Sequence, residues 1–190
     1  MPSPASDARR RPRRDALRND AIIIDAARAV FAEQGPQASM ESIASRAGLG
    51  VGTIYRRFAG KEDLLDAIAR LVVEEVDEAA ADALADPDPA RGLERFIDFV
   101  GVFHTEKRRY AAALAQRVAI DDVSRRTTEK VEQLTRKAVE AGVLAPGTTG
   151  DDIKALIVAT RAVIAASPDK EPPAWRRFVR IHLAGLRTDR

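Results

Sequence analysis

Hydrophobic and polar positions recur along this chain with the spacing of amphipathic α-helices. Residues 19–34 are an example, because their apolar side chains return every three or four positions until Gly35-Pro36 ends the run. The same spacing predicts helices over residues 40–47, 51–58, 61–84, 89–105, 108–118, 121–141, 151–166 and 173–186. The pattern therefore predicts an all-α fold.

Two of these expected helices, residues 40–47 and 51–58, are short and are separated by Gly48-Leu49-Gly50. Glycine reaches backbone angles that strain other residues, so it marks a break. In the second helix Val51, Ile54 and Phe58 share one apolar stripe, which so short a helix has to pack on its neighbours. The opposite face carries Gly52, Thr53, Arg56 and Arg57. This pattern is typical of a helix-turn-helix whose second helix enters the major groove of DNA.

The outward face of residues 51–58 carries groups that can read DNA. Arginine bonds two acceptors on guanine or grips a phosphate, so Arg56 and Arg57 are candidate contacts, together with Thr53. Gly52 leaves room for close approach of the backbone. Two arginines on a generic helix would indicate a solvated face, but the glycine break and the basic surroundings favour DNA contact here.

Three flanking residues are further candidates, each with an alternative. The Tyr55 hydroxyl could reach a phosphate, or the ring could simply pack at the edge of the stripe. Ser39 is placed to cap the helix that begins at Met40, and capping explains it as well as DNA contact does. Lys61 begins the next helix, where its ammonium group and the helix N-terminus would meet one phosphate.

The segment AGLGVGTIYRRFAGKEDLL, residues 47–65, resembles the DNA-binding region of the TetR family of bacterial transcriptional repressors. The matching positions are Gly48, Val51, Thr53, Ile54, Tyr55, Phe58, Lys61, Leu64 and Leu65. Gly50 differs from the serine that often caps the family's recognition helix, a change that costs about a few tenths of a kcal/mol. The resemblance implies an all-helical homodimer that binds palindromic operator DNA and releases it when a small molecule enters its larger domain.

Charge is unevenly distributed, although the net charge of the 190 residues is only +2. Through Lys61 there are 11 Lys and Arg against 6 Asp and Glu, whereas the rest of the chain has 20 against 23. A basic front end on a mildly acidic body indicates that a polyanion is met at one end only. Residues 1–15 are arginine-rich without an apolar period, so we expect a disordered segment. It could be a solvated tail or an arm that follows DNA.

Several functions lack the residues they need. The chain has no cysteine, and its two histidines, His104 and His182, are remote in sequence. Without a phosphate-cradling loop or a metal-ligand cluster, we expect no cofactor, no metal site and no enzymatic activity. No apolar run approaches the roughly 18 residues that span a bilayer, and the N-terminus lacks an apolar signal core. We therefore expect a cytoplasmic protein without membrane contact.

We expect a basic arm (residues 1–18), a helix-turn-helix DNA-binding domain (19–66) and a ligand-binding and dimerisation domain (67–190). The helix over residues 61–84 joins the last two. Five residues of the larger domain could line a ligand cavity: Phe96, Val100, Phe103, His104 and Tyr110. Ordinary core packing is the alternative for each of them.

The last two expected helices carry more apolar surface than one core face requires. Small side chains that would let another helix approach closely are Ala155, Ala159, Ala162, Ala165 and Ala166. The TetR resemblance implies that these helices form the interface of a homodimer. A dimer has two helix-turn-helix domains, here called reading heads, which suit the two half-sites of a palindrome. The alternative is that they only close the core of the monomer.

The leading function is a DNA-binding transcriptional regulator, a dimeric repressor released from its operator by a small apolar ligand. A regulator without such an inducer is the first alternative. A helical enzyme or an adaptor at a membrane surface would leave the groove-reading face of residues 51–58 unexplained.

Overall fold

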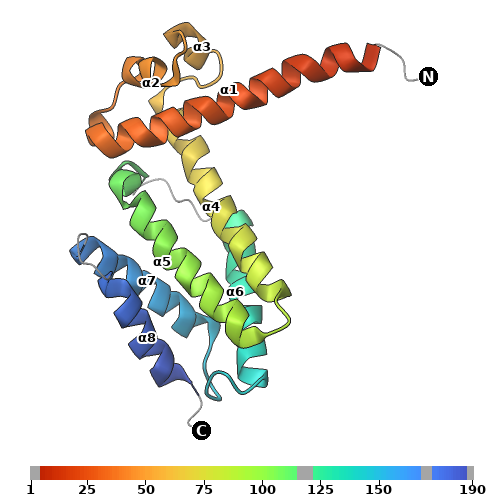
Figure 1. Cartoon of the computed structure of the whole chain (residues 1–190), viewed down its shortest axis with the longest axis vertical. Helices are drawn as coiled ribbons and strands as arrows, with labels where there is room; N and C mark the ends of the chain where they lie inside the picture. The colour runs from red at the N-terminus through yellow and green to blue at the C-terminus, as the bar shows by residue number, and fades with distance from the viewer. Residues whose placement is uncertain (1–4, 115–121, 168–172, 188–190) are drawn as a thin grey trace. The chain divides into compact units, whose positions relative to one another are not determined.

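The computed structural model describes residues 5–114, 122–167 and 173–187, and within these ranges the protein is built of helices without a β-strand (Figure 1). The helices are α1 (Ala5–Gln34), the 3-10 turn η1 (Gly35–Gln37), α2 (Met40–Ala47), α3 (Val51–Tyr55), α4 (Lys61–Ala85), α5 (Pro89–Leu114), α6 (Asp122–Glu140), α7 (Gly150–Ala166) and α8 (Ala174–Leu186). The prediction of an all-α fold is confirmed.

The chain divides into two compact units. The first comprises the residues up to Arg70 together with the last turns of α5 from Arg109, and the second comprises Leu71–Arg108 and the later helices. Both α4 and α5 are therefore shared between the units. The division within α4 falls four residues beyond the expected boundary at residue 66.

Helix α1 differs from the expectation at its N-terminal end. A segment without regular structure was expected over residues 1–18, whereas the helix already includes Ala5. Alanine and arginine, which make up most of residues 5–14, are good helix formers, and the helix continues through them despite Pro12. Residues 5–14 lack the apolar period that indicates a packed helix, but their composition still favours helix formation.

In the first unit, apolar side chains from four helices are buried. The apolar face of α1 is buried, with Ile23, Ala27 and Phe31 fully inaccessible to solvent. The side chains buried with them from α2, α3 and the start of α4 include Met40, Ile43, Ala44, Ile54, Leu64, Leu65 and Ile68. Helix α2 packs on α1 and α3 packs on α2, so a short helix that is unstable alone is fixed by its neighbours.

Helix α5 is continuous where two helices were predicted over residues 89–105 and 108–118. Thr105 does not interrupt it, because its hydroxyl donates to the Gly101 carbonyl oxygen one turn back, at 2.8 Å. Neither glycine nor proline occurs between residues 102 and 114, so nothing ends the helix there. The predicted residues 115–118 lie outside the described ranges.

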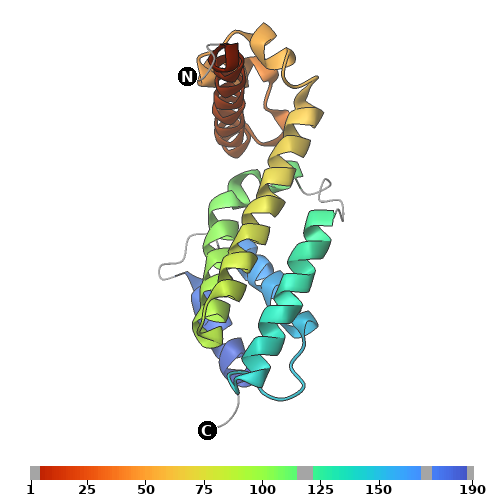
Figure 2. The same cartoon turned by 90° about the vertical axis from the view of Figure 1, so that its right-hand side faces the viewer.

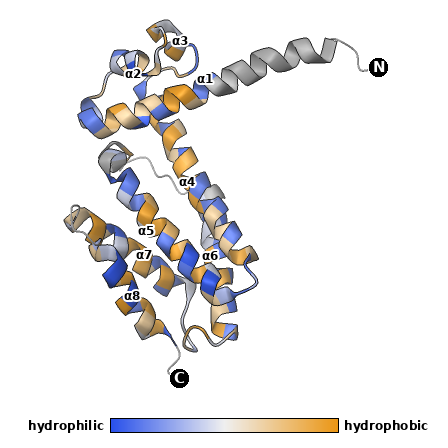
Figure 3. Ribbon diagram, viewed as in Figure 1, coloured by the Kyte–Doolittle hydropathy of each residue, from blue (hydrophilic) through white to orange (hydrophobic). Residues whose placement is uncertain are grey.

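Helices α4 to α8 all contribute side chains to one hydrophobic core of the second unit, and Figure 2 shows the course of these helices. Its fully buried members include Ala80, Phe96, Leu134, Leu144 and Ile153. Hydrophobic and hydrophilic positions alternate along these helices (Figure 3), as amphipathic packing requires. Helix α6 packs against α7, and α7 packs against α8.

A buried carboxylate closes the corner between α4 and α5. Asp86 accepts hydrogen bonds from the Asp88 backbone N–H at 3.0 Å and from the Arg91 Nε and Nη2 atoms at 3.0 and 2.6 Å. These donors, the Arg91 guanidinium first, lower the pKa of the Asp86 carboxyl to about 2. The corner is thus held by a carboxylate that stays ionised at any ordinary pH.

Candidate functional site

The first half of the helix-turn-helix is defined by caps at both ends of α2. The Ser39 Oγ atom accepts a hydrogen bond from the Ser42 backbone N–H at 3.1 Å, which is the geometry of an N-cap. Gly48 ends the helix with a φ of +65°, a conformation that favours glycine. The capping role of Ser39 is confirmed, while its contact with DNA stays a prediction.

Helix α3 is shorter than the predicted residues 51–58. It ends at Tyr55, but the chain continues in a tight turn in which the Arg57 and Phe58 N–H groups both donate to the Ile54 carbonyl oxygen at 2.8 Å. Ile54 and Phe58 are buried as predicted. The prediction was wrong for Val51, which is 37% exposed, because it is the first residue of the helix and lies beyond the edge of the packed stripe.

The predicted contact residues on the outer face of α3 are accessible. Gly52 is exposed, and an added Cβ there would meet no atom within 4 Å. Tyr55 as a whole is 48% exposed, which argues against the alternative that it only packs. Arg56 is exposed, and its Nη2 atom donates to the Thr53 Oγ1 atom at 3.0 Å, so these two side chains form one polar surface.

Lys61 is the first residue of α4, as predicted. Its Nζ atom donates to the Pro36 carbonyl oxygen at 2.7 Å. This hydrogen bond ties the start of α4 to the turn after α1. It uses one of the three ammonium donors, so the remaining two are sufficient for a phosphate.

Arg57, the other predicted arginine, is paired with a carboxylate of α1. Its Nε atom donates to Asp20 Oδ1 at 2.6 Å, and its Nη2 atom donates to Asp20 Oδ2. The hydrogen bonds and charge of Asp20 raise the pKa of the Arg57 guanidinium. The sequence pattern did not indicate Asp20 as a partner of Arg57, because the two residues are 37 positions apart.

A second arginine–carboxylate pair joins α2 to α1. The Arg46 Nη2 atom lies 2.5 Å from Glu33 Oε2, and both side chains remain largely exposed. Arg46 is therefore an exposed charge of α2 that pairs with a carboxylate of α1.

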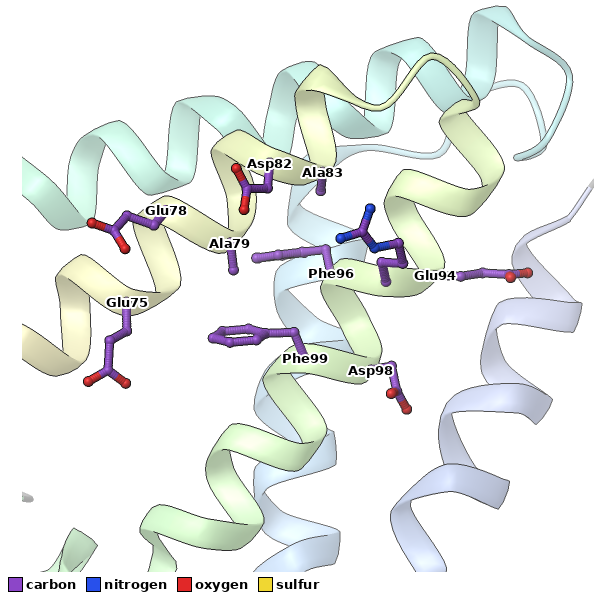
Figure 4. A pocket seen from close by; sticks show the side chains of 10 residues that line it. Glu75, Glu78, Ala79, Asp82, Ala83, Glu94, Phe96, Asp98 and Phe99 are labelled. Atoms are coloured by element: carbon purple, nitrogen blue, oxygen red, sulfur yellow. The ribbon is translucent and has the colours of Figure 1, made fainter.

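The second unit contains a cleft of about 620 Å³ between α4 and α5 (Figure 4). Phe96 and Phe99 project from α5 toward α4, and Glu78 and Asp82 extend from α4 (Figure 4). The other residues of the lining are Glu75, Ala79, Ala83, Glu94, Arg95 and Asp98. The cleft thus combines two aromatic rings with several carboxylates.

Three of the five carboxylates in this cleft are neutralised by basic side chains. The pairs are Glu75 with Lys107, Glu94 with Arg187, and Asp98 with Arg176 at 2.9 Å. Within the described ranges Glu78 and Asp82 form no ion pair, and the one guanidinium of the lining, Arg95, is directed to Asp86 at 3.4 Å. The cleft therefore carries net negative charge.

Of the five residues predicted to bind a ligand, only Phe96 is among those that line this cleft. Val100 belongs to the hydrophobic core, and Phe103 and Tyr110 are also buried. The Phe103 ring contacts the Phe99 ring, with centroids 5.4 Å apart. Ordinary core packing, the alternative considered from the sequence, therefore describes Val100.

His104 is a half-buried residue beside the Phe103 ring, with ring centroids 5.5 Å apart. Burial, and then the charges of Arg161 and Lys107, lower the pKa of its imidazole to about 4. His104 is therefore neutral at pH 7. No group of three or more metal-ligating side chains is present in the described ranges, and none of their helices is long and apolar enough to cross a membrane.

Comparison with known proteins finds similarity to one family of bacterial regulators. Residues 23–68, which contain the helix-turn-helix, match the model of the bacterial regulatory proteins of the TetR family. A TetR transcriptional regulator from Streptomyces coelicolor is 28% identical, with 90% of this chain and 99% of that chain covered and a TM-score of 0.69. A TetR transcription regulatory protein from Mycobacterium vanbaalenii is 29% identical, with coverages of 93% and 99% and a TM-score of 0.71.

A more distant structure shares the fold. SmeT, the repressor of the Stenotrophomonas maltophilia multidrug efflux pump SmeDEF, is 22% identical over 90% of this chain and 91% of its own, with a TM-score of 0.67. No curated protein matches the sequence. The fold and the reading helices define a helix-turn-helix transcriptional regulator, which is a DNA-binding protein and not an enzyme. Its residues 23–68 match the TetR family, and the chain as a whole has the fold of the solved TetR regulators.

Proposed function

We propose that this protein is a cytoplasmic dimeric repressor that binds a palindromic operator and leaves it when a small ligand enters the second unit. The observation that carries this proposal is the accessible outer face of α3, where Thr53, Tyr55 and Arg56 stand beside the unobstructed backbone of Gly52. Arginine and threonine side chains on a helix held in this way can reach base edges. Ser39, Arg57 and Lys61 are the proposed supporting contacts.

Selection from a random duplex library tests the DNA-binding part. The wild-type protein is expected to enrich a palindrome, and Arg56→Ala is expected to lower affinity for it by about 10-fold, since a good bidentate base contact is worth about 1–3 kcal/mol. A reporter driven by the enriched site separates repression from activation. Failure to enrich any sequence, or undiminished affinity after Arg56→Ala, contradicts the assignment.

The dimer is proposed to form through α7 and α8. Support comes from their outer surfaces, where Val158 is 63% exposed and Ile181 is 52% exposed. Four of the five small residues predicted for close approach, namely Ala155, Ala162, Ala165 and Ala166, are also exposed on α7. Large apolar side chains left on neighbouring helices are typical of a surface that another copy covers.

The ligand is proposed to occupy the α4–α5 cleft. Phe96 is kept from the predicted ligand contacts, and Phe99 joins it as the second ring of the cleft. The unpaired carboxylates Glu78 and Asp82 would repel an anionic ligand, so the cleft favours an apolar molecule that carries positive charge. Because α4 contributes to both compact units, a shift of α4 is the proposed route from ligand to reading heads. The ligand has to bind the two arrangements with different affinity.

Two probes of similar shape and different charge test the ligand class. Tetraphenylphosphonium is expected to bind the free protein in calorimetry and to release labelled operator, whereas neutral triphenylphosphine oxide is expected to bind more weakly. Glu78→Gln with Asp82→Asn should remove the difference between the two probes, and Glu140→Gln on α6 is the control. If neither probe binds, this cleft is not the inducer site, and the regulator without an inducer becomes the better description.

A further inference from the structure

The pairing of Arg57 with Asp20 leaves part of the guanidinium free. Arginine has five N–H donors in a planar fork, one on Nε and two on each Nη. Asp20 takes the Nε donor and one donor of Nη2. Within the described ranges no other hydrogen bond is made by this guanidinium, so the edge formed by Nη1 and Nη2 still offers parallel donors. That edge is the one a guanine or a phosphate needs for a bidentate contact.

We propose that Asp20 is a positioning residue that holds the Arg57 guanidinium by one edge and presents the other edge to DNA. The inference rests on the proposed function, because it assumes that the protein reads an operator. Asp20 lies on α1 and Arg57 in the turn that follows α3, so the pair also fixes that turn to the longest helix of the unit. Side-chain exposures of 25% for Asp20 and 38% for Arg57 leave the guanidinium accessible.

The orientation that Asp20 gives to the Arg57 side chain matters for DNA binding, because Arg57 lies in the turn after α3 and not within the helix. An arginine side chain in a turn loses conformational entropy when it is fixed by DNA, and a bond to Asp20 made beforehand removes part of that cost. The carboxylate also cancels the long-range charge of Arg57. It therefore lowers the nonspecific attraction to any duplex while favouring the one geometry that matches a site.

These two effects separate Asp20 from a residue that only stabilises the fold. Asp20→Asn keeps the shape of the side chain but removes its charge. The ratio of operator affinity to random-duplex affinity should fall by about 10-fold, because the bidentate contact of Arg57 with DNA is weakened. Affinity for random duplex should be unchanged or higher, and its dependence on salt equal or steeper. A loosened fold would instead weaken both.

The test is a set of gel-shift titrations with both duplexes at several salt concentrations, with thermal unfolding measured for each variant. Asp20→Glu should retain most of the ratio, because a carboxylate remains. Arg57→Ala should lower the ratio, and Asp20→Asn should lower it no further in that background. Glu33→Gln is the matched control, since Glu33 lies on the same helix and pairs with an arginine that has no proposed DNA contact.

Four outcomes overturn the inference. They are an unchanged ratio in Asp20→Asn, a higher ratio in that variant, an equal loss in the Arg57→Ala background, and an equal loss in Glu33→Gln. A higher ratio would mean that Asp20 competes with DNA for Arg57. If the wild-type protein enriches no sequence, the proposed function fails and this inference fails with it, whereas enrichment with an unaffected Asp20→Asn variant overturns this inference alone.

Discussion

At Gly52, an added side chain should affect DNA binding without weakening the fold. An added Cβ at this position would meet no atom of the protein within 4 Å, and glycine inside a helix costs about 0.5–1 kcal/mol relative to alanine. Gly52→Ala should therefore leave the free energy of unfolding unchanged or raise it by up to about 1 kcal/mol. Operator affinity should fall, because the methyl group would stand between the backbone and the DNA.

Parallel thermal unfolding and gel-shift measurements check this prediction. Lower stability would show that Gly52 is needed for the conformation of α3. Full operator affinity in a stable variant would show that the backbone of α3 does not approach the bases closely.

His104 gives the second unit a pH dependence whose direction follows from its pKa. The folded protein holds the pKa of this imidazole at about 4, against an ordinary value of 6.5, first because of burial and then because Arg161 and Lys107 repel a proton. The unfolded chain therefore takes up the proton first as pH falls. The contribution of neutral His104 to stability is complete above pH 6.5 and is lost between pH 6.5 and 4.

His104→Gln isolates this contribution. Between pH 6.5 and 4 the wild-type protein should lose on the order of 2 kcal/mol more of its unfolding free energy than the variant does. Denaturant titrations at a series of pH values measure the difference, in which the carboxylates common to both proteins cancel. Parallel curves for the two proteins would mean that the imidazole is solvated in the folded state.

Local residue patterns were sufficient where the signal and its effect lie close together in the sequence. Ser39 and Gly48 each lie directly beside the end of α2 that they mark, and the predicted bounds of α2 match the structure. Long-range pairs were not predictable in this way. The Asp20 carboxylate reaches Arg57 because α1 packs on α2 and α2 packs on α3, and no periodicity of the sequence encodes that contact.

At the scale of helices, predictions from local patterns also held, whereas features that depend on contacts between helices were less predictable. The apolar period located α4 and α6 to α8 within one or two residues, because each helix buries one face. Ligand contacts were harder, since an aromatic stripe on α5 has the same pattern whether it lines a cavity or fills a core. Phe96 belongs to the core and also lines the cleft, whereas Val100, one turn later, belongs to the core without lining the cleft.

The contact of α5 with α8 depends on a glycine. A Cβ added at Gly101 would overlap the six-membered ring of Trp175, which is itself buried in the core. Gly101→Ala should therefore destabilise the protein by about 1–3 kcal/mol through overpacking, although alanine is the better helix former. Chemical denaturation measures the loss.

Trp175→Leu places a smaller side chain opposite residue 101 and should relieve the overpacking caused by Gly101→Ala. The loss in the double variant should be clearly smaller than the sum of the two single losses, because the leucine leaves space for the added methyl group. Additive losses would show that Gly101 and Trp175 do not press on each other, and a stabilised Gly101→Ala variant would contradict the packing of α5 on α8.

The basic beginning of α1 is expected to act as an element of its own. Five arginines lie between residues 9 and 14, and each phosphate that they neutralise adds roughly 0.9 to the slope of log affinity against log salt. Deleting residues 1–14 should weaken operator binding and flatten this slope, while the unfolding temperature stays the same. An unchanged slope would identify the segment as a solvated extension.

For the whole molecule, assembly is the property on which the reading of a palindrome depends. Val158 and Ile181 are more than half exposed in the single chain, so changing them should leave the fold of the monomer intact. Ile181→Glu should dissociate a dimer formed through α7 and α8, because a carboxylate at the centre of an apolar interface is costly to bury and central side chains contribute about 2 kcal/mol or more. Sedimentation velocity measures the change in mass.

Loss of the dimer should have a consequence for DNA that a simple loss of stability would not have. A monomer has one reading head, so Ile181→Glu should bind a full palindrome no more tightly than a single half-site, whereas the wild-type protein should bind the palindrome far more tightly. Gln133→Glu, which adds the same charge at an exposed position of α6, should retain both the dimer and the preference. A wild-type protein that sediments as a monomer while it binds the palindrome would contradict this arrangement, because the two half-sites would then be filled independently and the apolar surface of α7 and α8 would need another partner.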